Sequence, residues 1–133
     1  MLADEQTARE IGALVDATYE AMSTPGSNVG EIFAASDVAI AGSGQGELWS
    51  GPDAVAAVAT AVSSLGFRWR PEKLTVWRRG DVAWAQILGS VRVVREGVDE
   101  DVPYWTTGVF GHDDGRWRWL YWGGSEPQES PKV

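Results

Sequence analysis

The sequence that decides the fold is VPYWTTGVFGHDDGRWRWLYWGGS, residues 102–125, where aromatic and β-branched residues flank a short acidic turn. Residues of these types are typical of β-strands. The Asp113-Asp114-Gly115 segment carries the turn residues that join antiparallel neighbours. We therefore predict two long strands over residues 102–111 and 116–125, paired as a hairpin.

The same pattern extends backwards from this hairpin. Residues 67–78 and 81–95 also predict strands, joined by a turn at Arg79-Gly80-Asp81, and an acidic loop at residues 96–101 is expected to follow. In the first half of the chain the apolar residues follow a different spacing. Apolar residues recur at helical spacing, and Gly and Pro residues separate the segments. This pattern predicts helices over residues 4–22, 29–35 and 52–65. Short strands are expected at residues 38–41 and 47–49.

Helices followed by a meander of strands indicate an α+β domain. A chain of 133 residues suits one such domain. We expect it to span residues 1–127, with residues 128–133 forming a polar C-terminal tail.

Composition narrows the function classes. The net charge of −8 opposes binding to phosphate backbones, so we expect no nucleic-acid partner. Without cysteine, and with His112 alone, the chain offers poor ligands for a transition metal, and we expect no metal or cofactor. No run is apolar enough to cross a membrane, and the acidic start is unlike an export signal; we expect a cytoplasmic protein without a membrane partner.

A three-residue turn at 113–115 would place Val109 opposite Trp119 and Trp105 opposite Gly123. One face would then carry Trp105, Thr107, Val109, Trp117, Trp119, Tyr121 and Ser125. Bulky residues would also occupy the second face, which monomers seldom expose. We therefore expect a symmetric homodimer. Its interface is predicted to comprise Trp84, Gln86, Leu88, Tyr104, Thr106, Phe110, Arg118, Leu120 and Trp122.

Several segments in this order resemble one superfamily. They are Asp37-Val38-Ala39-Ile40, residues 42–49, Gly51-Pro52-Asp53-Ala54-Val55, Phe67-Arg68-Trp69, Gly80-Asp81-Val82-Ala83-Trp84 and Asp114-Gly115-Arg116-Trp117-Arg118-Trp119. Together they make the chain similar to NTF2-like proteins, and within them to the SnoaL-like branch. The segments specify a fold and include no catalytic signature.

The resemblance implies a cone in which a curved antiparallel sheet packs against three helices of the N-terminal half around a pocket. Relatives include steroid isomerases, polyketide cyclases, dehydratases and non-catalytic binding or association domains. In many of them the last two strands offer an Arg and a His-x-Ser to the pocket. Here those positions hold Trp105 and Gly123-Gly124-Ser125, which lack a titratable group. This departure weakens the transfer of acid–base chemistry.

Three residues are the candidates for such chemistry. In isomerase relatives a tyrosine and carboxylates act inside an apolar cone. Tyr19 lies at the edge of the first helix's apolar stripe and could serve as an oxyanion donor, with Asp37 or Glu47 as base. An Asp at the start of a strand more often bonds to local backbone.

The leading hypothesis is instead a binding protein. Eight tryptophans exceed what a core of this size needs, so some should line a pocket or an interface. We expect a small hydrophobic ligand, aromatic or polycyclic, in a cone lined by Tyr19, Trp49, Trp69, Trp105, Thr107, Trp119, Tyr121 and Ser125. Two alternatives stay open: an isomerase- or cyclase-like enzyme, and an association module whose cone is filled with side chains.

Overall fold

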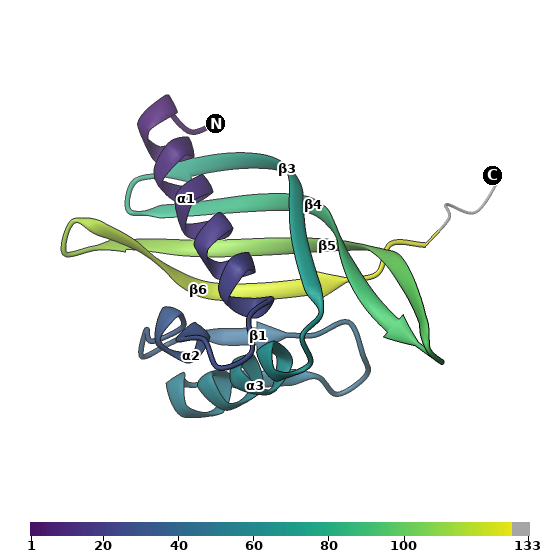
Figure 1. The fold of residues 1–133 in the computed structure, drawn as a ribbon. Coiled ribbons are helices and arrows are strands. Elements are labelled where there is room, and N and C mark those ends of the chain that lie inside the picture. The colour runs from purple at the N-terminus through teal and green to yellow at the C-terminus, as the bar shows by residue number, and fades with distance from the viewer. Residues whose placement is uncertain (129–133) are drawn as a thin grey trace.

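The computed structural model describes residues 1–128 and confirms the α+β architecture (Figure 1). In chain order its elements are α1 (Glu5–Met22), α2 (Val29–Ile32), β1 (Ala39–Ala41), β2 (Leu48–Ser50), α3 (Pro52–Ser64), β3 (Arg68–Arg79), β4 (Val82–Arg95), β5 (Val98–Asp113) and β6 (Arg116–Ser125). The strands form one sheet in the order β2-β1-β6-β5-β4-β3. Neighbours are antiparallel except β1 and β6, which run parallel.

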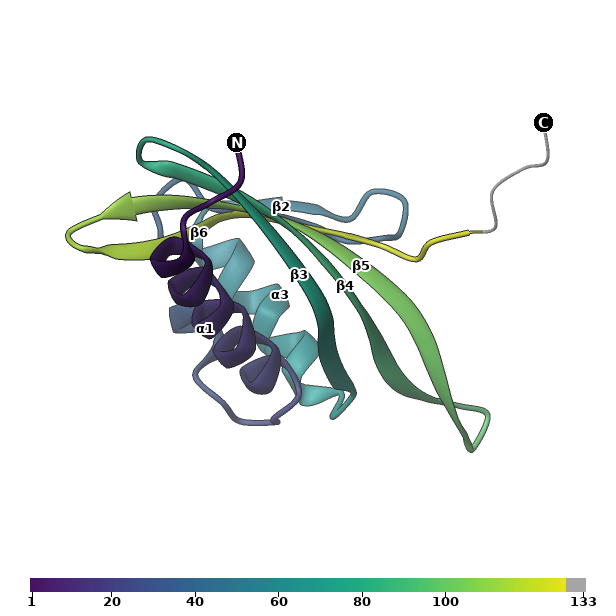
Figure 2. The same ribbon diagram turned by 90° about the horizontal axis from the view of Figure 1, so that it is seen from above.

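All three helices lie on one side of the curved sheet, which we call the inner face (Figures 1 and 2). The first helix begins where Asp4 accepts a hydrogen bond from the Thr7 amide at 2.8 Å. Arg78 of β3 donates to the Thr7 hydroxyl at 2.6 Å, which ties this helix end to the sheet. The third helix follows Gly51, whose φ of 88° favours glycine, and Pro52 starts it.

Two turns differ from the sequence-based expectation. The acidic residues 96–101 do not form a loop: Glu96 and Gly97, both with positive φ, make a tight turn, and β5 begins at Val98. The last hairpin turns at Asp114 and Gly115, so Asp113 already pairs with Arg116. Two-residue turns with left-handed residues match the twist of antiparallel strands. The expected three-residue turn was therefore wrong.

A β-bulge also shifts the last hairpin. Phe110 pairs with Trp119 but Val109 pairs with Tyr121, so Leu120 is the extra residue of β6. The shorter turn and the bulge overturn the expected register, in which Val109 faced Trp119. On β5, Tyr104, Thr106 and Phe110 are buried on the inner face, whereas Trp105 and Thr107 are exposed on the outer one. The faces predicted for β5 were reversed.

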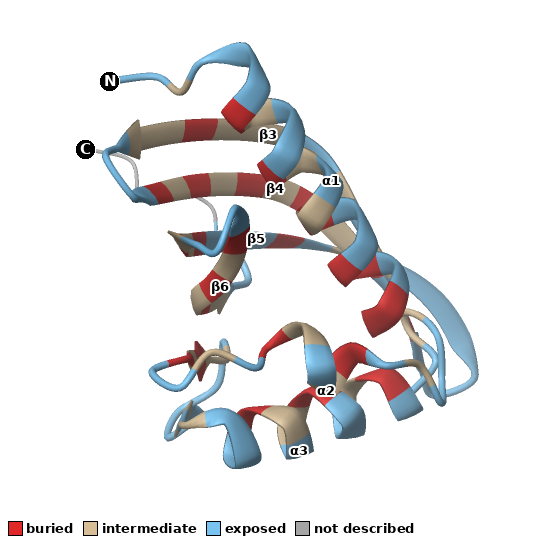
Figure 3. Cartoon of the chain, turned by 90° about the vertical axis from the view of Figure 1, so that its left-hand side faces the viewer, coloured by how far each residue is buried: buried red, intermediate tan, exposed pale blue. Residues whose placement is uncertain are grey.

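The core fills the space between the helices and the inner face, where buried segments of α1 and α3 turn toward the strands (Figure 3). Alternation along β4 buries Ala83, Ala85 and Ile87 beneath the helices, while Trp84 and Gln86 point outward. The small side chains of Ala83 and Ala85 let the helices approach the sheet closely.

Candidate functional site

One end of the inner face is hollow. A cavity of about 240 Å³ lies between α3, the β1–β2 segment and strands β3 to β6. Its lining comprises Met22, Phe33, Ile40, Gly42, Ser43, Glu47, Trp49, Val58, Ala59, Val62, Leu65, Phe67, Trp69, Val91, Val93, Arg95, Tyr104, Trp122 and Glu126. Most of these side chains are apolar, which is typical of small-molecule sites.

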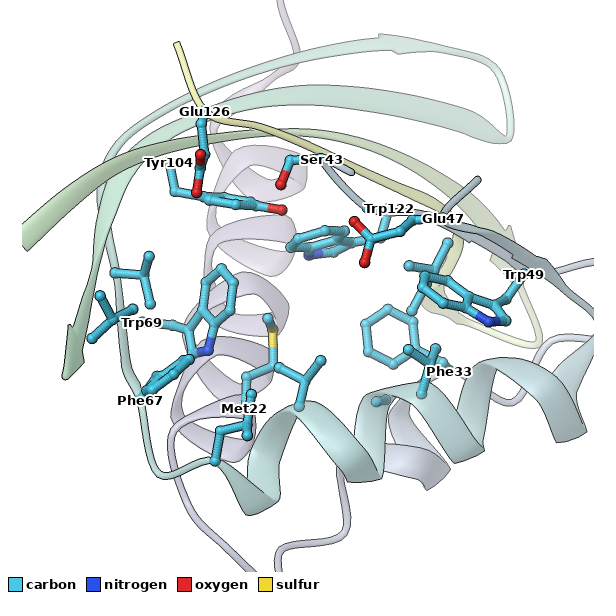
Figure 4. Close-up of a pocket in the computed structure, with 18 of the residues that line it drawn as sticks. Met22, Phe33, Ser43, Glu47, Trp49, Phe67, Trp69, Tyr104, Trp122 and Glu126 are labelled. Atoms are coloured by element: carbon cyan, nitrogen blue, oxygen red, sulfur yellow. The ribbon is translucent and has the colours of Figure 1, made fainter. Parts of the chain in front are cut away.

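Aromatic rings form the upper wall of this cavity. Figure 4 shows the rings of Tyr104 and Trp122 side by side above its open centre, with Trp69 at one side and Trp49 and Phe33 at the other. Tyr104 and Trp122 are stacked, with centroids 5.8 Å apart and planes inclined by 30°. Trp69 meets Tyr104 edge to face at 4.9 Å and Trp122 at 6.1 Å. The three rings brace one another, so their positions are set without a ligand.

The indole N–H groups of Trp69 and Trp122 are buried and have no hydrogen-bond acceptor within residues 1–128. A buried donor without a partner costs about 1–3 kcal/mol. Because both nitrogens are covered by neighbouring atoms, the carbon surfaces of these rings make up the cavity wall. The wall is therefore rich in π-electron density and poor in hydrogen-bond donors.

Gly124 explains why two large rings fit flat against β6. A Cβ atom at this position would lie within 2.6 Å of Tyr104 Cε1 and 2.7 Å of Trp122 Cζ3. Any side chain there would push both rings off the strand and into the cavity. The glycine thus keeps the cavity open.

Polar groups gather at one end of the cavity. In Figure 4, Ser43 and Glu47 lie toward the Tyr104 hydroxyl, and Glu126 lies beside the other end of the tyrosine side chain. Glu47 accepts a hydrogen bond from the Gly44 amide. Burial raises the pKa of the Tyr104 hydroxyl; Glu47 and Glu126 raise it further, and hydrogen bonding from Ser43 acts in the opposite direction. The hydroxyl is therefore protonated at neutral pH and can donate to a ligand.

Tyr19 does not reach the cavity. Its side chain is 3% exposed, and its hydroxyl donates to Thr106 Oγ1 at 2.7 Å. Burial raises the pKa of this phenol strongly. The expectation that Tyr19 lines the pocket was wrong. Thr106 lies on the inner face of β5, opposite to the face predicted for it, and there it accepts the hydrogen bond from the Tyr19 hydroxyl.

The structure also separates the two candidate carboxylates. Asp37 is exposed and lies beside a different surface hollow, near His112 and Arg118, whereas Glu47 lies at the cavity mouth. The expected grouping of Tyr19 with either carboxylate is not formed. Among the predicted catalytic residues, Glu47 alone lines the cavity.

Of the predicted pocket residues, Trp49 and Trp69 line the cavity. Trp119 faces inward but is fully buried in the core, where its ring packs against Phe110 with centroids 4.5 Å apart. The remaining four lie outside the cavity because they belong to the outer face or its edge: Trp105, Thr107, Tyr121 and Ser125.

The predicted interface residues divide in the same way. Trp84, Gln86 and Leu88 lie half-buried on the outer face. Tyr104 and Trp122 line the cavity, and Thr106 and Phe110 are buried in the core. Arg118 and Leu120 are half-buried on β6. The placement of Tyr104, Thr106, Phe110 and Trp122 on the outer face was wrong, for the reasons of turn length and bulge given above.

A signal for the missed ring Tyr104 was present in the sequence. Glu96-Gly97 is a dipeptide suited to a tight turn, and a two-residue turn there pairs Gly89 with Tyr104 and Ile87 with Thr106. Directly opposed residues share a face, so the inward Ile87 would have placed both β5 residues inward. Met22, Phe33 and Phe67 carried no comparable signal, because only packing brings their segments to the cavity.

No three His, Cys, Asp or Glu side chains within residues 1–128 are grouped as a metal site. In the same part of the chain, no helix combines the length and apolar character needed to cross a bilayer.

Solved structures share this architecture. An NTF2-like superfamily protein from Salmonella enterica serovar Typhimurium matches with a TM-score of 0.82 at 12% identity, covering 97% of this chain and 96% of its own. A member of the NTF2-like family from Streptomyces avermitilis also gives 0.82, at 16% identity, covering 94% and 99%. An NTF2-like protein with a cystatin-like fold from Novosphingobium aromaticivorans gives 0.77 at 20% identity, covering 94% and 85%. The fold is thus the NTF2-like cone.

The family can be stated more closely. Residues 11–129 match the model of the SnoaL-like domain, and the chain belongs to that family. None of the curated proteins is significantly similar to it in sequence. The resemblance drawn from the fold-specifying segments is confirmed.

Proposed function

We propose that this protein binds a small hydrophobic, aromatic molecule in the cavity beneath Tyr104 and Trp122. The supporting observation is the cavity of about 240 Å³ walled by rings that are braced in place. Ligand pockets usually have volumes of about 300–1,000 Å³. A cavity slightly below that range favours a compact ligand over a large polycyclic one.

Ligand binding is tested by filling the cavity. Val62 lines it from α3, and Ala61 is exposed on the same helix. We expect naphthalene derivatives to quench tryptophan fluorescence saturably and to raise the melting temperature. The Val62→Phe variant should lose both effects, while Ala61→Phe retains them. Flat responses from folded wild-type protein would contradict the proposal.

We further propose that the outer face pairs two copies of the chain. No helix of residues 1–128 covers this face, which carries Trp77, Trp84, Trp105 and Tyr121, with Trp105 41% exposed (Figure 2). A standard interface buries about 800 Å² per partner, roughly a tenth of the 8110 Å² surface of this chain.

Light scattering tests the homodimer. The Trp105→Glu variant should be monomeric where the wild type is dimeric, because it places a charge within an apolar contact. Val98 is 63% exposed on the β4–β5 hairpin, so Val98→Glu is the matched control and should leave the dimer intact. A monomeric wild type with the same face would point to a different protein partner.

Acid–base catalysis of the isomerase or cyclase type is a second candidate function. It would use Tyr104 in place of Tyr19. Tyr104 and Glu47 lie at the same cavity mouth, and a protonated phenol beside a carboxylate could stabilise an enolate while the carboxylate moves a proton (Figure 4). Turnover of a ketone substrate that Tyr104→Phe abolishes and Tyr19→Phe preserves would favour catalysis. Binding without turnover favours the first proposal.

A further inference from the structure

Negatively charged side chains outnumber positively charged ones around the cavity mouth. Arg95 lies between Glu100 and Glu126, with nitrogen–oxygen distances of 3.9 and 3.8 Å. Its charge is thus shared by two carboxylates. Glu47 has no ion-pair partner within residues 1–128, and it accepts a hydrogen bond from the Gly44 amide. The mouth therefore carries a net negative charge.

The wall next to this charge is also attractive to cations. Figure 4 shows the rings of Tyr104 and Trp122 above the open centre of the cavity, with the Glu47 carboxylate beside the Trp122 ring. Aromatic faces attract an ammonium group within about 6 Å of the ring centroid, and recognition of quaternary ammonium ligands relies on several such rings. The aromatic rings and the Glu47 carboxylate both favour binding of a cation.

We propose that the ligand is an organic cation: an aromatic or aliphatic body that occupies the apolar part of the cavity, with an ammonium group beside Glu47. This inference rests on the proposed ligand-binding function and specifies its chemical class. A net charge of −8 on the whole chain adds a field that draws cations and repels anions.

An anionic ligand fits the same cavity poorly. The indole N–H groups that could bind an anion are covered. Arg95 is the cationic side chain of the lining, and it is already flanked by two carboxylates. An anion would have to displace one of these carboxylates and approach Glu47, both of which cost free energy.

Three probes of similar size separate the ligand classes: benzyltrimethylammonium, its uncharged isostere neopentylbenzene, and the anion phenylacetate. Binding is followed by tryptophan fluorescence for the wild type and for Glu47→Gln. Glu20 is exposed on α1, so Glu20→Gln makes the same change in net charge away from the cavity. Salt dependence on the wild-type protein supplies a measurement that needs no variant.

We expect benzyltrimethylammonium to bind at least about ten-fold more tightly than phenylacetate. Glu47→Gln should lower the affinity for the cation about five-fold relative to neopentylbenzene, and Glu20→Gln should not. Raised salt should weaken binding of the cation alone. A cation-to-neutral affinity ratio that neither Glu47→Gln nor salt changes would overturn the inference while ligand binding stands. If no probe binds, the proposed function itself fails.

Discussion

The two ends of the cone use tryptophan in opposite ways. At the closed end, Trp119 is fully buried, packs against Phe33 and Phe110, and donates its indole N–H to Thr18 at 2.9 Å. At the open end, Trp69 and Trp122 surround a cavity and their N–H groups have no acceptor. Around Trp119 the packing is dense and the indole N–H has an acceptor, as in a stabilising core, whereas Trp117 Nε1 and Arg118 Nε on the same strand are buried without a partner. Trp69 and Trp122 instead border an open cavity, which fits a surface kept for a ligand.

Removing a ring from each end should test this comparison most strongly. Trp119→Ala is expected to lower the free energy of unfolding by about 3–5 kcal/mol, because it empties packed space and leaves Thr18 without its donor. Trp49 lines the open end and is half-buried, so Trp49→Ala should cost clearly less. Urea unfolding followed by circular dichroism measures both. Equal losses would mean that the two ends are not specialised.

Replacing the glycines of β6 separates the two faces at adjacent positions. A Cβ at Gly124 meets Tyr104 and Trp122 at the cavity, whereas one at Gly123 meets Tyr121 on the outer face, 2.6 Å from its Cε2. Gly124→Ala should cost about 1–3 kcal/mol and weaken ligand binding about ten-fold. Tyr121 is half-buried and can rotate away, so Gly123→Ala should leave ligand affinity unchanged. Fluorescence titration measures the ligand affinity of both variants. Loss of binding in both would contradict the assignment of Gly124 to the cavity and Gly123 to the outer face.

The hydrogen bond between α1 and β5 lies behind the cavity wall, because Thr106 pairs with Gly124 and the Tyr19 ring meets Trp69 edge to face at 6.4 Å. Tyr19→Phe leaves the buried Thr106 hydroxyl without its donor and should cost about 1–3 kcal/mol without changing ligand affinity. Adding Thr106→Val should recover part of that loss, because both polar groups are then absent. Chemical denaturation of the single and double variants gives the coupling energy. Weakened binding in Tyr19→Phe would place this tyrosine in the site after all.

The smallest expected effect concerns alkaline pH. The folded state raises the pKa of Tyr19, so the stability linked to its protonation is complete below the ordinary value of 10.0 and is lost as pH rises above it. If Tyr19 stays protonated in the folded state but ionises in the unfolded state, the free energy of unfolding at pH 11 is about 1.4 kcal/mol lower than at neutral pH. Denaturation between pH 9 and 11 should show a steeper decline for the wild type than for Tyr19→Phe. Parallel declines would contradict a buried, protonated Tyr19.

Part of the site followed from sequence and part did not. Trp49 and Trp69, two of the predicted pocket residues, lie on β2 and β3 and line the cavity. Trp105 and Tyr121 were assigned to the wrong face because the last hairpin turns one residue later than expected and contains a bulge at Leu120. A slip of one residue moves every side chain of a strand to the opposite face.

The sequence by itself determined the local elements: the helical stripe of α1, the Gly51-Pro52 start of α3, and the aromatic strands of the second half. These depend on periodicity and on residues with special backbone preferences, which act over a few positions. Only the tertiary structure decided that Trp119 fills one end of the cone while Tyr104 and Trp122 leave the other end open. That outcome depends on strand register and on the volume enclosed by segments distant in sequence, and neither is encoded in any single stretch of the chain.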